Sequence, residues 1–234
     1  MPPFTLHMPD SLDEALAIAG QLQESDSEFD WVAGGTDLLP NYKWHINHKP
    51  NVISLVNVAE LSALTPTHIG AMVRLNDLVE YEDTHSLVQA AAASVASVMI
   101  RRSGTVGGNI CLDTRCFWFN QTEEWRRSIE WCHKCDCGTG ADCLVIANQN
   151  TLCVATYQAD MAPALMGLGA VIDKVGRETG IFTRVVRVRV GGRVGGVSGF
   201  CGTRKTHQVD GHEADKQKDG KMDGHGCAKI RGNW

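Results

Sequence analysis

The sequence predicts an α+β fold that begins with a small α/β lobe, continues through a cysteine-rich segment and ends in a low-complexity tail. Three observations predict it. Strand-type and helix-type patterns alternate from residue 4 to residue 56, glycine-rich turns occur at 33–38 and 103–109, and four spaced cysteines follow the second turn. A chain of 234 residues that is 43% hydrophobic can bury one good core or two small ones.

The first lobe is predicted to span residues 1–58. Ser11 and Glu14 form a capping-box pattern, which satisfies free backbone amides where a helix starts, and apolar residues then recur at helical spacing as far as Leu22. The other elements that we expect are strands at 4–7, 29–33 and 52–56 and a short helix at 37–44. Together they make a small βαβ-type unit.

The glycine-rich turns are the candidate ligand-binding segments. Gly34 and Gly35 lie between an expected strand and helix, where backbone amides can approach a phosphate closely; a plain tight turn is the alternative. The second turn, Ser103–Asn109, follows a helix expected over 86–100. Two such loops converging on one ligand are stronger evidence than either alone.

The predicted tail covers residues 175–234. Residues 1–174 hold 10 Lys and Arg against 21 Asp and Glu, whereas the tail holds 12 against 6 and carries 13 of the 24 glycines. The acidic body argues against a nucleic-acid partner. A strand or two is expected within 175–190. The rest of the tail lacks regular periodicity and is predicted to be disordered or the product of a truncated or shifted reading frame.

Composition also bears on location. No apolar run approaches the roughly 20 residues of a membrane span, and the first residues lack the layout of a secretory signal. We therefore expect a cytoplasmic protein whose nine cysteines are reduced ligands, with an extracellular disulfide framework as the alternative.

Four sequence blocks resemble the FAD-binding subunit of the xanthine dehydrogenase and carbon monoxide dehydrogenase family. They are VAGGTDLLP at Val32–Pro40, IGAMVRLNDL at Ile69–Leu78, IRRSGTVGGNI at Ile100–Ile110 and ADMAPALMGLGA at Ala159–Ala170. The resemblance implies the two-lobed α+β FAD-binding fold of the molybdenum hydroxylase flavoproteins, with a second lobe at 59–174 that is interrupted by a cysteine-rich insertion at 112–152. It also implies that the usual C-terminal domain of the family is absent here.

The resemblance assigns FAD-binding roles to both glycine loops and to the closing segment. The implied residues are Ala33, Gly34, Gly35, Thr36, Asp37, Leu38, Thr105, Gly108, Asn109 and Asp160. For Asp37 and Asp160 a helix cap is an equally good interpretation.

The insertion resembles that of the 4-hydroxybenzoyl-CoA reductase beta subunits, which binds an additional 4Fe-4S cluster. The resemblance runs through Cys111–Arg127 and implies cluster ligands at Cys116, Cys132, Cys143 and Cys153. Cys135 and Cys137 are alternatives to Cys143. Cys132 and Cys135 also form a CxxC pattern that suits zinc or a redox pair. The aromatic residues of the insertion are predicted to form a small core. Arg126 and Arg127 are expected on a solvated face, with a docking patch for an acidic electron donor as the alternative.

The function that the resemblance implies is electron relay. Ferredoxin would reduce the chain, and partner subunits carrying 2Fe-2S clusters and a molybdenum cofactor would remove the ring hydroxyl of 4-hydroxybenzoyl-CoA reductively. No catalytic acid, base or nucleophile is expected in this chain. The alternatives are the FAD subunit of another hydroxylase of this family and a non-catalytic, cysteine-rich zinc-binding module.

Overall fold

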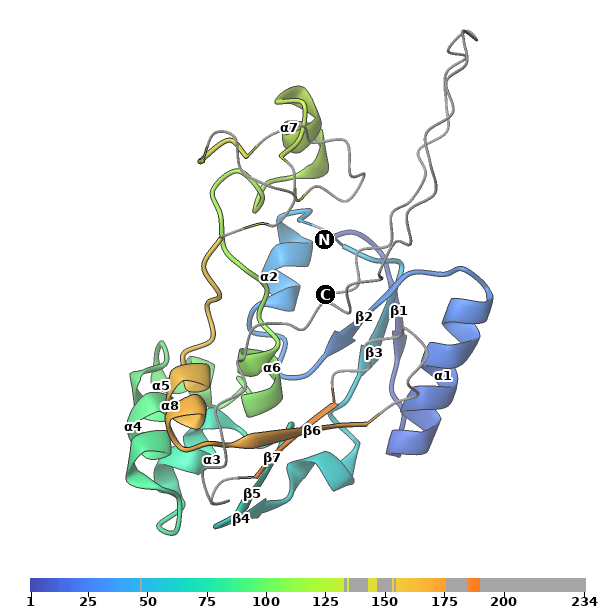
Figure 1. The fold of residues 1–234 in the computed structure, drawn as a ribbon. Helices are drawn as coiled ribbons and strands as arrows, with labels where there is room; N and C mark the ends of the chain where they lie inside the picture. The colour runs from blue at the N-terminus through green and yellow to red at the C-terminus, as the bar shows by residue number, and fades with distance from the viewer. Residues whose placement is uncertain are drawn as a thin grey trace, which may run out of the picture.

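The computed structural model describes residues 1–46, 48–132, 134, 143–146, 153, 155–175 and 185–189. The predicted two-lobed α+β architecture is confirmed (Figure 1). Cys135, Cys137 and the tail beyond residue 189 lie outside the described residues, so the predictions made for them stay predictions. Within the described part, every helix is too short or too polar to cross a bilayer.

The first lobe is a three-stranded parallel sheet with strand order β1-β3-β2. Its elements in chain order are β1 (Thr5–His7), α1 (Leu12–Glu24), β2 (Phe29–Val32), α2 (Leu38–Lys43) and β3 (Asn51–Ser54). Each strand and helix expected in this lobe is present, with ends that differ by one or two residues. Parallel strands need crossover connections, which α1 and α2 with their loops supply.

The predicted capping box of α1 forms with one change of partner. The Ser11 hydroxyl accepts a hydrogen bond from the Glu14 amide at 3.2 Å. The Glu14 carboxylate reaches back to the amide of Asp10 at 2.9 Å rather than to that of Ser11. The helix then buries Ala15 and Ala19, and Ala15 packs in a core cluster with Leu55 and Met72.

The second lobe contains an antiparallel sheet with strand order β4-β5-β7-β6 and a group of short helices. Its elements are η1 (Ala59–Ser62), β4 (Leu64–Thr65), β5 (His68–Gly70), α3 (Leu75–Glu80), α4 (Ser86–Ser94), α5 (Val98–Arg101), α6 (Val106–Ile110), α8 (Met161–Gly167), β6 (Val171–Val175) and β7 (Val185–Arg189). Strand β7 falls within the predicted tail and pairs with both β5 and β6. The largest core cluster lies in this lobe and includes Leu78, Val88, Val106 and Met161.

The single helix expected over 86–100 is wrong, because the chain breaks between α4 and α5. Ala96 has a left-handed φ of 41°, and Ser97 caps α5 by accepting a hydrogen bond from the Ile100 amide at 3.4 Å. The Arg101 guanidinium donates to the carbonyls of Val95 and Ala96 at 2.8 and 3.2 Å. These bonds satisfy the carbonyls that the break exposes.

The insertion carries α7 (Glu123–Ser128) and extends beyond α2 and α6 (Figure 1). Arg126 is only 1% exposed, donates to the carbonyls of Phe119 and Gln121, and lies 5.4 Å from the Phe119 ring. The prediction that Arg126 belongs to a solvated face is therefore wrong, since the arginine anchors the small core of the insertion. Arg127 is exposed, as expected, and pairs with Glu123.

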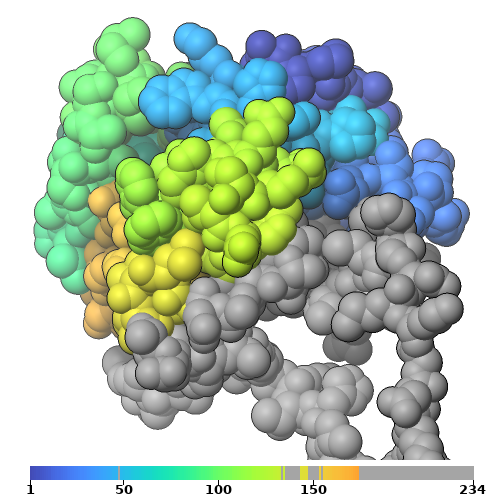
Figure 2. All heavy atoms as spheres, turned by 90° about the horizontal axis from the view of Figure 1, so that it is seen from above, coloured from blue at the N-terminus to red at the C-terminus, as the bar shows by residue number. Residues whose placement is uncertain are grey.

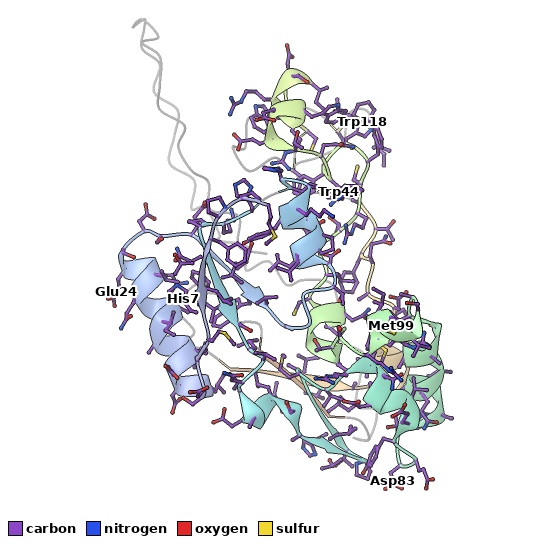
Figure 3. All side chains as sticks on the ribbon, turned by 180° about the vertical axis from the view of Figure 1, so that it is seen from behind. His7, Glu24, Trp44, Asp83, Met99 and Trp118 are labelled. Atoms are coloured by element: carbon purple, nitrogen blue, oxygen red, sulfur yellow. The ribbon has the colours of Figure 1, made fainter. Side chains whose placement is uncertain are left out.

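The predicted aromatic core is only partly formed. Phe119 is buried, but Phe117 is 70% exposed and lies in a surface group with Trp118 and Trp125. Trp118 and Trp44 lie on the same side of the molecule, at the opposite end from Asp83 (Figure 3).

Candidate functional site

The two glycine loops meet at one cleft of about 850 Å³. All ten residues that the resemblance assigned to cofactor binding line this cleft, so the structure brings them together from three distant parts of the sequence. Cys111 and several residues of the insertion line it as well, namely Leu112, Asp113, Arg115, Phe119 and Asn120. Seen from above, the insertion lies across the boundary between the two lobes (Figure 2).

The first loop packs directly on the second at Gly34. A Cβ atom added there would lie 1.8 Å from the Ser103 carbonyl oxygen, so only glycine permits this backbone contact. Gly35 has φ +68°, a conformation that glycine adopts at no steric cost. The turn at 33–38 is therefore both a tight turn, as the structural alternative held, and one wall of the cleft.

The backbone of the first loop leaves donors free in the cleft. Within the described residues, the backbone N–H groups of Gly34, Gly35, Thr36 and Asp37 donate no hydrogen bond to the protein. These four residues are partly exposed along the cleft wall. Successive unpaired N–H groups form a concave surface that favours an anion.

Backbone hydrogen bonds hold the second loop against the segment that joins β5 to α3. The amide of Val106 donates to the Val73 carbonyl at 3.0 Å and that of Gly107 to the Ala71 carbonyl at 2.8 Å. The buried Thr105 caps α6, its hydroxyl accepting from the Gly108 amide at 3.1 Å. Because these bonds pin the loop, its cleft-facing side is pre-organised.

Asn109 joins the second loop to the closing segment. Its Nδ2 donates to the Asp160 carboxylate at 3.2 Å, and its Oδ1 accepts from the Met161 amide at 3.0 Å. Asn109 is 7% exposed. It thereby brings Asp160, 51 residues away, to the cleft.

Neither aspartate caps its helix with its side chain, so the cap interpretation is wrong for both. The Asp37 carboxylate instead accepts from Asn41 Nδ2 at 3.2 Å and forms an ion pair with Arg115 of the insertion. Asp160 accepts from Asn109. Both carboxylates are thus available to organise the cleft rather than a helix end.

The opposite end of the cleft, at the start of β2, has a different electrostatic character. Asp30 accepts a hydrogen bond from the buried Tyr42 hydroxyl at 2.8 Å. Burial raises the pKa of Asp30 above its ordinary value, and the hydrogen bond from Tyr42 and the charge of Lys49 oppose the rise. Burial and the Asp30 charge raise the pKa of Tyr42 as well.

The residues present fit a dinucleotide cofactor. The cleft has the volume of a small-molecule site, about 300–1,000 Å³, and it offers the four unpaired amides of the first loop beside a glycine that admits no side chain. A pyrophosphate needs such donors because the surrounding protein carries a net charge of −5.

The four predicted cluster ligands are placed but not gathered. Cys132 is buried, and Cys116, Cys143 and Cys153 are half-buried. Among the described residues, no group of three or more His, Cys, Asp or Glu side chains is arranged to hold a metal ion. The assignment of these four cysteines as cluster ligands therefore stays a prediction, and we derive no electron-transfer step through a cluster.

Two contacts at the site were not predicted from the sequence. The carbonyl of Ser103 lies against Gly34 where the two loops meet, and Arg115 provides the cation beside Asp37. The only available signal for Arg115 was a basic residue just before a candidate ligand, which is too common a pattern to assign a role.

Comparisons with known proteins identify the family of the chain. Residues 2–187 match the family described as FAD binding domain in molybdopterin dehydrogenase. Over 159 residues the chain is 28% identical to the aldehyde oxidoreductase FAD-binding subunit PaoB of Escherichia coli K12. The matched region covers 62% of this chain and 48% of that subunit. Over 116 residues it is 34% identical to the carbon monoxide dehydrogenase medium chain of Hydrogenophaga pseudoflava, with coverages of 47% and 39%.

A solved structure shares the fold over most of the chain. It is the Cu,Mo-CO dehydrogenase in its cyanide-inactivated form, which matches with a TM-score of 0.52 and 20% identity over 81% of this chain and 60% of that chain. The chain spans about half the length, or less, of the two curated relatives above.

Proposed function

Since the chain belongs to the family of FAD-binding domains in molybdopterin dehydrogenases, we propose that it carries FAD as the electron-transferring part of an oxidoreductase of the xanthine and carbon monoxide dehydrogenase type. The observation that supports this best is the set of four unpaired amides at Gly34–Asp37, held against Ser103 where the two glycine loops meet. When bound, FAD supplies the redox chemistry, while the protein supplies binding and orientation.

The residues of this chain divide that task. The amides of the first loop hold the phosphates, and the fixed second loop with Thr105 and Gly108 forms the facing wall. Asn109 holds Asp160 at the cleft, where its carboxylate can accept a hydrogen bond from the cofactor. None of these side chains transfers a proton, so the site binds and orients the cofactor and is not itself a reaction centre.

A finer proposal places the chain among the 4-hydroxybenzoyl-CoA reductase beta subunits. It rests on the resemblance of Cys111–Arg127 and on the four cysteines Cys116, Cys132, Cys143 and Cys153. The chain would then bind a 4Fe-4S cluster, accept electrons from ferredoxin and work in the cytoplasm with 2Fe-2S and molybdenum-cofactor subunits. Because metal binding and folding are coupled, this proposal requires the insertion to close around the cluster.

A second candidate is the FAD subunit of another hydroxylase of the same family. The names of the relatives favour it, since they include an aldehyde oxidoreductase subunit and a carbon monoxide dehydrogenase chain. This candidate needs FAD but no cluster on the insertion.

Cofactor content separates the candidates. The full chain is purified without oxygen, and iron, acid-labile sulfide, zinc and FAD are measured per polypeptide. The finer proposal expects one FAD with about four iron and four sulfide, lost in Cys116→Ser and kept in Cys111→Ser. FAD without iron supports the other hydroxylase, and zinc without sulfide or FAD overturns both in favour of a zinc-binding module.

A further inference from the structure

We propose that Arg115, a residue of the cysteine-rich insertion, is a further binding residue of the cleft and contacts the phosphates of the bound dinucleotide. This inference rests on the proposed function and deepens it. Its starting point is the charge of the cleft. The described lining holds six carboxylates and two cations; the carboxylates are Asp26, Glu28, Asp30, Asp37, Asp113 and Asp160, and the cations are Lys49 and Arg115.

Only one of the two cations lies beside the glycine loops. Lys49 pairs with Glu28 at 3.4 Å. Glu28 is the residue before β2, whereas the first glycine loop begins after the last residue of β2. A four-residue strand extends roughly 13 Å, so the Lys49 pair lies at the far end of that strand. Arg115 pairs with Asp37, which is part of the loop itself.

The contacts of Arg115 leave room for a second anion. Its Nη2 donates to Asp37 Oδ1, and Nε and Nη1 have no hydrogen-bond partner within the described part of the chain. A guanidinium carries five donors in a planar fork and suits phosphate oxygens. About 38% of the side chain is exposed in the cleft wall, so a ligand can reach it.

The backbone also fixes where Arg115 lies. Its amide donates to the Thr156 carbonyl at 3.2 Å, which ties the start of the insertion to the segment that returns to α8, and the two segments run side by side in Figure 1. Asp37 is held in turn by Asn41. The cation is thus placed by contacts on both sides, and its loss would leave the Asp37 carboxylate uncompensated next to the phosphates.

The test compares Arg115→Gln with Arg127→Gln in the full chain. Arg127 is a matched control because it belongs to the same insertion and forms an exposed pair with Glu123, outside the cleft lining. Dissociation constants for FAD and for ADP are measured at low and high salt. Loss of a charge-assisted hydrogen bond predicts that Arg115→Gln weakens both ligands by about 10- to 100-fold, while Arg127→Gln leaves both unchanged.

Salt dependence separates a phosphate contact from a merely structural role. Exposed charge interactions are screened by salt, so FAD binding should weaken with salt more steeply in the wild type than in Arg115→Gln. Arg115→Lys keeps the charge and should retain more affinity for FAD than Arg115→Gln. If the glutamine variant does not fold, the lysine variant is compared with the wild type instead.

The outcomes distinguish the two claims. If the wild type binds FAD and both Arg115 variants match its affinity or its salt dependence, this inference is overturned and the proposed function still stands. A folded wild-type chain that binds neither FAD nor ADP overturns the proposed function and this inference with it.

Discussion

Replacing Gly34 with alanine tests the contact between the two glycine loops. The added Cβ would lie 1.8 Å from the Ser103 carbonyl oxygen, against the 3.4 Å at which ordinary contacts begin, so the loops would have to separate by about 1.6 Å. The opposing atoms are backbone atoms, which cannot turn away as a flexible side chain can. Forcing extra volume into such a site costs about 1–3 kcal/mol, and we expect the upper part of that range.

The assay is urea unfolding of the full chain together with FAD titration of the folded protein. Gly34→Ala should lower the free energy of unfolding and weaken FAD binding, because a displacement of about 1 Å is enough to spoil a positioned site. Gly20→Ala is the control, since nothing lies within 4 Å of its Cβ position on α1. It should stabilise the chain by about 0.5–1 kcal/mol. If Gly34→Ala matches Gly20→Ala in stability and in FAD affinity, the loop contact does not hold the site.

Two further predictions concern buried polar groups. Asn109→Ala leaves the Met161 amide without its acceptor and Asp160 without its donor, so we expect the free energy of unfolding to fall by about 1–3 kcal/mol; a change within experimental error would contradict the role given to Asn109. For Asp30, whose pKa burial raises above 3.8, the stabilising contribution of the protonated carboxyl is complete below pH 3.8 and is lost as the pH rises through the raised pKa. The stability of the wild type relative to Asp30→Asn should therefore decline from acid to neutral pH in denaturant unfolding, and a difference that is independent of pH would refute the raised pKa.

Local patterns in the sequence were enough to predict much of the first lobe and both glycine loops. The Ser11–Glu14 capping box depends on residues three apart, and strand and helix periodicities are equally local. The ten candidate cofactor residues came from a family resemblance, and the structure adds that they share one cleft. Their contact with FAD stays a prediction until binding is measured.

The errors arose where tertiary contacts override local pattern. The sequence favours a surface position for Arg126, but its guanidinium donates to the carbonyls of Phe119 and Gln121 and is buried in the core of the insertion. The break between α4 and α5 depends on bonds from Arg101 that no periodicity reveals, although Ser97 is a residue type that favours a helix start.

Long-range pairings are the least predictable features of the site. Asp37 and Arg115 are 78 residues apart, and an Asp–Arg pairing over such a separation has no signature in a single sequence. The same holds for Gly34 and Ser103: the glycine is visible in the sequence, but the atom that requires it is not.

The most direct test of the central claim is equilibrium binding of FAD to the purified full chain, followed by flavin fluorescence. The account predicts one FAD per chain, displaced by ADP because the loop amides hold the phosphates, and weakened by Gly34→Ala but not by Gly20→Ala. A folded chain that binds no FAD, or whose bound FAD is insensitive both to ADP and to Gly34→Ala, would contradict it.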